Sequence, residues 1–357
     1  MSKHFLIVKT SAIGDIIQSF PVIEYLREKF PGCAIDWALE KRYEDLLTAH
    51  PFVRQVFTMD SYHLRKKWYH PSTLKELFAF RRKLQGFSYD AIFDLQGNAK
   101  SALITSFAKG SAKIGFGWKS VPEKLNLLVT SHRFNVSESV NIQKRYLSLV
   151  QSYFQDAGSF TPQGVTLHLS PKEEDTLSHF NFDHHMNIMV AFGSKWENKQ
   201  LSPDTLIKFL QKIDHNYKPY FFFVWGSIKE KEEAERLTHL FPERSCMLGN
   251  LSFALWQGIM CRMHSVIAMD SAALHLSGTT DTPSFSVFGP SASSVYKPLG
   301  SQHAHIQGAC PYNEKFIQRC PILRTCKTGA CMKNLQAEEL FKQYASTNYH
   351  RVRSPSQ

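Results

Sequence analysis

Short, nearly continuous apolar runs recur along the first half of the chain, and stretches with helical periodicity separate them. The runs are FLIVKT, AIDWAL, VRQVFTM, YDAIFDL and KIGFG. Runs of this kind are typical of parallel strands that are covered on both faces of a sheet. Residues 71–84 show a helical pattern, and Pro71 and Ser72 are typical of a helix start. We therefore predict a parallel sheet built from alternating strands and helices.

The same alternation begins again after a polar stretch at residues 159–187. The second series contains the runs IMVAFG, YFFFVWG, SVIAMD and SFSVFG, with helical patterns at residues 203–213 and 229–240. Two such series predict an α/β protein with two Rossmann-like domains whose parallel sheets face a central cleft. We place these domains at residues 1–170 and 171–332. We expect residues 333–357 to form a helix and tail that can pack back on the first domain.

The composition is that of a soluble globular protein, because 43% of the 357 residues are apolar and 20% are charged. No run approaches the roughly 18–20 apolar residues of a membrane span. The N-terminus enters a strand without a hydrophobic signal segment, so we expect a cytoplasmic protein. The net charge of +11 suits a nucleic acid, an anionic membrane face, or a phosphorylated or carboxylated substrate. A basic surface without a specific partner is the alternative, and no nucleic-acid motif is recognisable.

The first strand leads into the loop TSAIGD and then into a helix. Gly14 permits a tight turn, and Thr10 and Ser11 are small enough for a ligand to approach the backbone. Asp15 can be a helix N-cap or a general base, and the roles are compatible because a helix N-terminus favours the carboxylate form. The loop lacks G-x-G-x-x-G and G-x-x-x-x-G-K-[ST], which argues against a dinucleotide oxidoreductase and a P-loop NTPase.

Two further stretches of the first domain are candidates for ligand binding. Gln96 and Lys100 follow the run YDAIFDL, at the strand end where open α/β sheets bind ligands. Arg65 and Lys66 belong to YHLRKKWYH, where mixed basic and aromatic residues suit an anionic sugar, a lipid headgroup or nucleic acid. A turn with a solvated lysine and a solvated loop are the respective alternatives.

Candidate phosphate-binding residues lie in the second domain. Ser194, Lys195 and Lys199 belong to the loop AFGSKWENKQLSP, which offers the small residues and lysines that a diphosphate needs. Glu230 falls in the first turn of the helix that follows VWGS. It can interact with the helix dipole alone, or it can hold the hydroxyls of a ribose. For the two lysines, solvated side chains are the alternative.

The most specific single motif is AMDSAALHLSG, in which a strand ends at Asp270 and a helix opens with Ser271 and Ala272. A helix N-terminus with small residues is a ready anion site. Asp270 would itself repel a phosphate, so we expect it to orient a lysine or backbone groups. His275 lies one turn into the helix, within reach of the anion. An N-cap aspartate and a packed histidine are the alternative.

Four of the seven cysteines crowd into the last part of the chain. They are Cys310, Cys320, Cys326 and Cys331. Their spacing, C-x9-C-x5-C-x4-C, differs from the short paired spacings of common zinc sites. We therefore expect free or partly oxidised thiols and no bound metal, and a zinc site at these four residues is the less favoured alternative.

Taken together, the ordered motifs of residues 3–300 resemble the ADP-heptose:lipopolysaccharide heptosyltransferases, most of all the heptosyltransferase I branch. The stretches that carry the resemblance are VKTSAIGDIIQSFPVIEYLREKFPG, YDAIFDLQGNAKSA, ENKQLSP, WGSIKEKEEAERL, MDSAALHLSG and VFGPS. The resemblance implies the GT-B architecture, with an N-terminal acceptor-binding domain and a C-terminal domain that binds the nucleotide sugar. It also implies an inverting, metal-independent reaction without a cofactor.

The resemblance assigns roles motif by motif. It implies that Asp15 is the catalytic base and that Lys199 meets the developing charge. The implied donor-binding residues are Ser194, Lys195, Lys199, Glu230, Asp270, Ser271, Ala272 and His275. The predicted acceptor-binding set joins the basic stretch to the two loops of the first domain: Thr10, Ser11, Gly14, Arg65, Lys66, Gln96 and Lys100.

The implied reaction moves heptose from ADP-L-glycero-D-manno-heptose to the Kdo of the lipopolysaccharide inner core. The implied partners are ADP-heptose, Kdo-lipid A and the anionic inner face of the cytoplasmic membrane, to which the protein would bind peripherally; nucleic acid is not among them. The sequence departs from the family pattern at Ala272, usually glycine, where the backbone must avoid positive φ, and at Leu201, usually tryptophan. Another nucleotide sugar, a later core acceptor, and a non-catalytic polyanion-binding protein are the alternatives.

Overall fold

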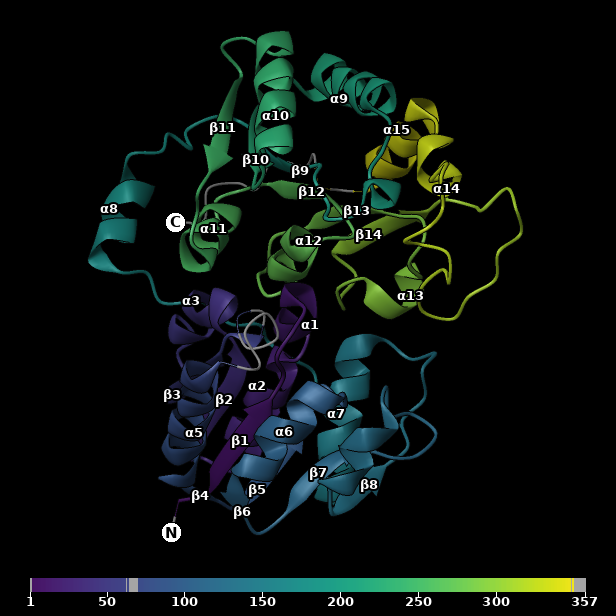
Figure 1. Cartoon of the computed structure of the whole chain (residues 1–357). Helices are drawn as coiled ribbons and strands as arrows, with labels where there is room; N and C mark the ends of the chain where they lie inside the picture. The colour runs from purple at the N-terminus through teal and green to yellow at the C-terminus, as the bar shows by residue number, and fades with distance from the viewer. Residues whose placement is uncertain (1, 62, 64–69, 348, 350–357) are drawn as a thin grey trace. The chain divides into compact units, whose positions relative to one another are not determined.

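The computed structural model describes residues 2–61, 63, 70–347 and 349. The chain forms two compact units, Met1–His168 and Leu169–Gln357. Each unit has its own six-stranded parallel sheet and its own set of helices (Figure 1). The division between the units falls two residues before the predicted boundary at residue 170. The α/β class that the alternating pattern predicted is confirmed.

The sheet of the first unit has the strand order β3-β2-β1-β5-β7-β8, and every neighbouring pair is parallel. The strands are β1 (His4–Val8), β2 (Ala34–Glu40), β3 (Gln55–Met59), β5 (Ala91–Asp94), β7 (Lys113–Phe116) and β8 (His132–Phe134), and β4 (Ser88–Tyr89) pairs separately with β6 (Lys109–Gly110). Along the chain, β2 and then β3 are added on one side of β1. The chain then returns to β5 on the other side of β1, and β7 and β8 are added beyond it. The order therefore reverses between β1 and β5, and open α/β sheets bind ligands at the carboxyl ends of the strands at such a point.

The sheet of the second unit repeats this topology, with the order β11-β10-β9-β12-β13-β14. Its strands are β9 (Asn187–Ala191), β10 (Tyr220–Trp225), β11 (Ser245–Gly249), β12 (Ser265–Met269), β13 (Ser284–Phe288) and β14 (His303–Gln307). Every residue of β9, β12 and β13 is buried. The order reverses between β9 and β12, so the loops after these two strands lie at the switch point of the second unit.

Helices alternate with the strands along both units. In the first unit they are α1 (Ile13–Ile17), α2 (Phe20–Lys29), α3 (Glu44–Thr48), α5 (Pro71–Gln85), α6 (Ala99–Phe107) and α7 (Ile142–Tyr153), with the 3-10 turns η1 (Lys41–Tyr43) and η2 (Lys124–Leu128). In the second unit they are α8 (Pro171–Ser178), α9 (Pro203–Tyr217), α10 (Ile228–Leu240), α11 (Phe253–Met260), α12 (Ala272–Ser277), α13 (Ser293–Tyr296), α14 (Ala330–Lys333) and α15 (Ala337–Ala345), with η3 (Glu197–Lys199). At the start of α9, Ser202 Oγ accepts the Thr205 N–H at 3.1 Å and Pro203 is the first helical residue. Among the described residues, no helix has the length and apolar character needed to cross a membrane.

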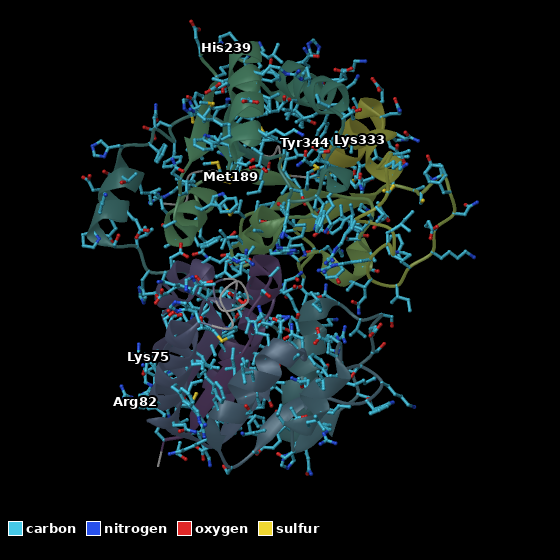
Figure 2. All side chains as sticks on the ribbon, in the orientation of Figure 1. Lys75, Arg82, Met189, His239, Lys333 and Tyr344 are labelled. Carbon is cyan, nitrogen blue, oxygen red and sulfur yellow. The ribbon has the colours of Figure 1, made fainter. Side chains whose placement is uncertain are left out.

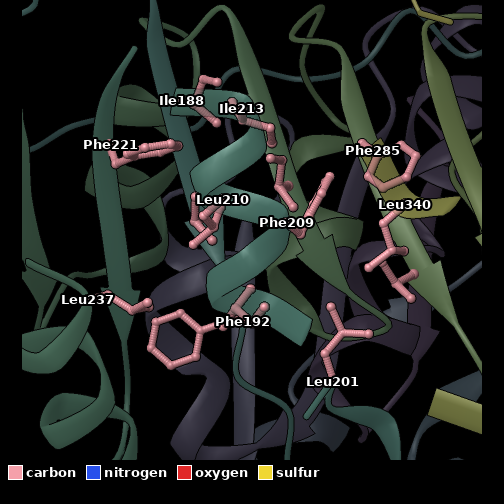
Figure 3. Packing of buried hydrophobic residues seen from close by; sticks show 14 of the residues in the cluster. Ile188, Phe192, Leu201, Phe209, Leu210, Ile213, Phe221, Leu237, Phe285 and Leu340 are labelled. Atoms are coloured by element: carbon pink, nitrogen blue, oxygen red, sulfur yellow. The ribbon is translucent and has the colours of Figure 1, made fainter. Parts of the chain in front are cut away.

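The core of the second unit lies between its sheet and the helices α9, α10 and α15 (Figure 3). Leu340 and Tyr344, four residues apart on α15, are both fully buried in this core. The Tyr344 ring lies 6.1 Å from that of Phe209 on α9 and 5.6 Å from that of Phe285 on β13, measured between centroids. The C-terminal helix therefore packs within the second unit, and its packing back on the first domain stays a prediction. Burying two large apolar side chains, at about 1.5–3 kcal/mol each, makes α15 part of the second unit.

Candidate active site

The switch point of the second unit brings Lys199 and Asp270 into contact. Lys199 ends η3, in the loop after β9, and Asp270 follows the last residue of β12. The Lys199 Nζ lies 2.5 Å from the Asp270 Oδ2, and the two side chains are only 10% and 8% exposed. The sequence argument expected Asp270 to orient a lysine, and the structure shows this contact.

The electrostatics of this pair keep Asp270 ionised. Burial alone would raise the pKa of Asp270, but the Lys199 charge and the nearby His275 outweigh burial and hold that pKa well below its usual range. The His275 Nε2 lies 3.6 Å from the Asp270 Oδ1. The other ring nitrogen, Nδ1, is buried and has no hydrogen-bond partner among the described residues. Asp270 is thus a fixed negative charge that holds the Lys199 ammonium in place.

Small polar residues tie the two loops of the switch point together. The Ser194 Oγ donates to the carbonyl oxygen of Asp270 at 3.4 Å, and the Gln200 Nε2 donates to the carbonyl oxygen of Ser194 at 2.7 Å. Ser271 is the N-cap of α12, and Ala272 begins that helix without a positive φ, as the replacement of glycine requires. Backbone N–H groups at this helix start are suited to an anion.

Glu230 caps the start of α10 and also reaches the end of β9. Its Oε2 accepts the N–H groups of Gly226 and Ser227 at 2.8 and 3.0 Å, and Ser227 Oγ accepts the Glu230 N–H at 3.3 Å. This is a capping box, so Glu230 stabilises the helix start, and its binding of a ribose stays a prediction. A Cβ added to Gly193 would lie only 2.0 Å from the Glu230 Oε1. Gly193 therefore makes room for the carboxylate beside the loop that carries Ser194 and Lys199.

Lys195 stands apart from this group. Its side chain is exposed, and its Nζ lies 5.8 Å from the centroid of the Trp196 ring. Of the predicted donor-binding residues, the structure brings Ser194, Lys199, Asp270 and His275 into one cluster. Their roles toward a ligand remain predictions.

At the switch point of the first unit, Gln96 fixes the loop that carries Asp15. The Gln96 Oε1 accepts the backbone N–H groups of Thr10 at 3.1 Å and Ser11 at 3.0 Å, and the Thr10 hydroxyl at 3.3 Å. Asp15 is half-buried, and its Oδ2 accepts the Ala12 N–H at 3.3 Å. The N-cap of α1 is Ala12, and Asp15 is the third helical residue, so the N-cap interpretation of Asp15 is wrong by three positions. The carboxylate reaches back to the helix start in the manner of a capping-box glutamate.

Lys100 forms an ion pair with Glu40, which ends β2. The Ser61 hydroxyl also donates to Glu40 and accepts from the Lys100 Nζ at 3.3 Å. The alternative of a solvated lysine is therefore wrong, because the buried Glu40 holds the ammonium. Arg65 and Lys66 lie outside the described residues.

The four late cysteines carry no disulfide. Among the residues that the structure describes, no three His, Cys, Asp or Glu side chains converge closely enough to form a ready metal site. The cysteines nevertheless line one cavity of about 320 Å³, which also receives Asn198, the neighbour of Lys199.

Comparison with known proteins decides the family. The model of glycosyltransferase family 9 (heptosyltransferase) matches residues 77–324, more than half of the chain. The chain belongs to this family. It is therefore an enzyme of the glycosyltransferase class, and the resemblance on which the sequence argument relied is confirmed.

Individual relatives agree with the family match. The lipopolysaccharide heptosyltransferase 1 of Escherichia coli strain K12 is 27% identical over 291 residues, which cover 80% of this chain and 87% of the relative. The solved structure of the E. coli heptosyltransferase WaaC with ADP has a TM-score of 0.78 at 22% identity and covers 96% of this chain and 99% of WaaC. WaaC with ADP-2-deoxy-2-fluoro heptose gives a TM-score of 0.76. These similarities confirm the GT-B fold.

Three residues of this family member's candidate site were missed from the sequence: Gly193, Asn198 and Glu40. Gly193 could have been recognised from the sequence, because it ends the apolar run IMVAFG just as Gly226 ends the run YFFFVWG. Glu40 also directly follows the predicted strand AIDWAL, at the edge where Lys100 was expected. Asn198 carried no signal, since its partners lie 125 and 128 residues further along the chain.

Proposed function

We propose that this enzyme moves heptose from ADP-L-glycero-D-manno-heptose to the Kdo of the lipopolysaccharide inner core. The observation that carries the proposal is the buried Lys199 at the switch point of the second unit, held by Asp270 beside the start of α12. A fixed ammonium and free backbone N–H groups are what a leaving diphosphate needs. Support for the sugar and the acceptor comes from the family and from WaaC, which binds ADP and a fluorinated ADP-heptose.

The proposed mechanism divides the substrates between the units. The first unit takes the acceptor, and the Asp15 carboxylate removes a proton from the acceptor hydroxyl as that oxygen attacks the anomeric carbon. The second unit takes the donor, and the bond from the anomeric carbon to the diphosphate breaks in the same step, so the configuration inverts. Lys199, Ser194 and His275 stabilise the charge that develops on ADP, without a metal in the catalytic step.

Two further assignments complete the donor and acceptor sites. Glu230 is proposed to hold the ribose hydroxyls with the Oε1 that faces Gly193, since its Oε2 is already occupied by backbone N–H groups. The loop that Gln96 holds is proposed to receive the acceptor sugar near Asp15. Lys100, paired with Glu40, would then meet an anionic group of that sugar.

The decisive experiment is incubation with ADP-heptose and Kdo-lipid A. We expect release of ADP and a mass increase of one heptose on the lipid, and no increase in rate on adding Mg²⁺. Lys199→Ala should lose most of this turnover, whereas Lys229→Ala, which removes an exposed ammonium of the same unit, should retain it. Lipid binding without ADP release would replace the proposal with the polyanion-binding alternative. ADP-sugar turnover that excludes heptose would point to another donor.

We also propose that the first unit binds peripherally to an anionic membrane face through α5. Leu74 and Phe78, four residues apart on this helix, are 54% and 65% exposed. Lys75, Arg81 and Arg82 lie around them and line a shallow hollow with Phe78; Lys75 and Arg82 are labelled at the outer edge of the first unit (Figure 2). Exposed apolar side chains among basic residues are typical of helices that lie in a lipid interface.

Vesicle co-sedimentation tests the membrane assignment. The protein should bind vesicles containing anionic lipid far better than vesicles of phosphatidylcholine alone, and salt should weaken the binding. The double variant Leu74→Ser/Phe78→Ser should lose most of the binding while its turnover of a soluble acceptor is unchanged. Equal binding by this variant would remove α5 from the proposal.

A further inference from the structure

The segment between β14 and α15 gathers four cysteines around one cavity. Three of them lie in irregular chain and Cys331 lies on α14, yet all four line the same cavity of about 320 Å³. The four thiols come from 22 residues of chain, of which all but the last two are irregular, so little regular hydrogen bonding holds this arrangement.

The backbone around the cysteines is fixed to the ends of β13 and β14. The Cys320 N–H donates to the carbonyl oxygen of Pro290 at 2.8 Å. Cys331 packs on two glycines: a Cβ at Gly289 would lie 3.0 Å from the Cys331 Sγ, and one at Gly308 would lie 1.8 Å from the Cys331 carbonyl oxygen. These close approaches place the cysteine backbone at defined points on the sheet edge.

One of the four sulfur atoms, that of Cys326, accepts a hydrogen bond from the backbone. The Gly329 N–H donates to the Cys326 Sγ at 3.4 Å, in a tight turn where Gly329 has a left-handed φ of 59°. The segment is also basic. Between the first and last of these cysteines the sequence contains one acidic residue, Glu314, and four basic residues: Lys315, Arg319, Arg324 and Lys327. A divalent cation held by four thiolates carries two net negative charges, which this basic segment would balance.

We propose that Cys310, Cys320, Cys326 and Cys331 form a structural site for one thiophilic divalent cation, Zn²⁺ or Fe²⁺. Four cysteine sulfurs in a tetrahedron are the usual ligand set for these ions, with metal–sulfur distances of about 2.3 Å. Each thiol gives its proton to solvent as its sulfur binds the cation. The cavity is wider than a bound ion requires, so binding draws the irregular segments inward. This proposal replaces the expectation of free thiols and is separate from the metal-independent catalytic step.

The proposed site is connected to the loop that carries Lys199. The Asn198 Nδ2 donates to the carbonyl oxygens of Leu323 at 2.9 Å and Cys326 at 2.8 Å. A Cβ at Gly329 would lie 2.8 Å from the Asn198 Oδ1, so Asn198 packs directly on the Cys326–Gly329 turn. Asn198 is adjacent to Lys199 in η3. A cation that orders the cysteine segment therefore also restrains η3.

Metal content of the purified full chain tests the site without any assay of transfer. We expect about one zinc or iron per chain by mass spectrometry of the metals. Replacing the ion with Co²⁺ should give the intense near-ultraviolet charge-transfer absorption of thiolate–cobalt complexes. Cys326→Ser should lower both signals at least several-fold, whereas Cys261→Ser, at an exposed cysteine outside the cluster, should leave both unchanged.

If Cys326→Ser does not fold, measurements on the wild-type chain alone still test the site. Substoichiometric metal, together with four thiols that react at once with a thiol reagent or with disulfides found among these four residues, overturns it. The connection to η3 has its own measurement: on removal of the cation, amide hydrogen exchange at residues 196–200 should accelerate at least several-fold, while exchange in β9 stays the same. Unchanged exchange at residues 196–200 would show that the cation does not restrain the Lys199 loop, and would overturn the proposed connection to η3.

Discussion

Replacing Lys199 with methionine removes the ammonium that lies 2.5 Å from the Asp270 Oδ2 while keeping most of the side-chain volume. Asp270 is then a carboxylate that is 8% exposed and has lost its closest countercharge. Breaking a buried ion pair by removing one partner costs about 3–5 kcal/mol. A domain is commonly stable by about 5–15 kcal/mol, so we expect Lys199→Met to remove a large part of the stability of the second unit.

Hydrogen exchange at the β12 amides measures this loss in the second unit alone, because the two units need not unfold together. The double variant Lys199→Met/Asp270→Leu should recover most of the stability, since neither charge is then buried. Lys229→Met is the matched control. Its ion pair with Glu197 has both side chains at least 70% exposed, and we expect no measurable change.

The pH dependence of stability should change sign in the variant. In the wild type the pKa of Asp270 is lowered, so below about pH 4, the ordinary aspartate value, the unfolded state binds more protons and stability falls as pH falls. Without Lys199, His275 still lowers the pKa of Asp270, but burial is the largest single contribution, so we expect it to raise that pKa. The folded variant then binds more protons than its unfolded state, and its stability should fall as pH rises from about 4 to 7. Loss of less than about 1 kcal/mol, or a variant profile parallel to the wild type, would refute this reasoning.

Three other substitutions test the proposed site. Asp15→Asn should lower kcat at least ~10²-fold, the low end of the general-base range, with ADP affinity nearly intact by calorimetry; near-normal turnover would remove Asp15 as the base. Gln96→Ala leaves three donors of the first loop without their acceptor, at about 1–3 kcal/mol, and should raise the acceptor KM about 10-fold with a smaller change in kcat. Gly193→Ala places a Cβ 2.0 Å from the Glu230 Oε1 and should weaken ADP binding about 10-fold, or ~1.4 kcal/mol. Gly226→Ala is its control, because a Cβ there would lie 3.5 Å from the Glu230 Oε2, an ordinary contact, and equal affinities for the two variants would contradict the ribose assignment.

The strands that the sequence predicted and those that it missed differ in their place in the sheet. All nine predicted apolar runs correspond to strands. Central strands such as β9, β12 and β13 are buried at every residue, which is why they read as continuous apolar runs. In the two six-stranded sheets the missed strands β8, β11 and β14 are edge strands, and β14 reads HAHIQ. The edge strand β3 was predicted, and the two-residue strands β4 and β6 of the separate small sheet were missed. An edge strand has partly exposed positions that are occupied by polar residues, so its sequence is not a continuous apolar run.

For the candidate site, the motifs predicted positions at strand ends but did not predict the partners of each side chain. It placed Lys199 and Asp270 after two strands, and parallel strands bring their carboxyl ends to one edge, so their meeting was predictable. The ion pair of Lys100 with Glu40 and the contacts of Asn198 depend on side-chain directions and long loops that periodicity does not describe. That the four cysteines line one cavity was missed for the same reason, since the spacing alone pointed away from a common site.

The contact between Gly193 and Glu230 links two positions that lie on different strand–helix connections, 37 residues apart in sequence. A side chain at position 193 and a glutamate at position 230 cannot share this space, because the added Cβ would fall inside the carboxylate. Among related sequences the two positions should therefore covary. A member that has replaced the glycine should carry a shorter residue at 230, and such members should differ from this protein in how they select the nucleoside of the donor.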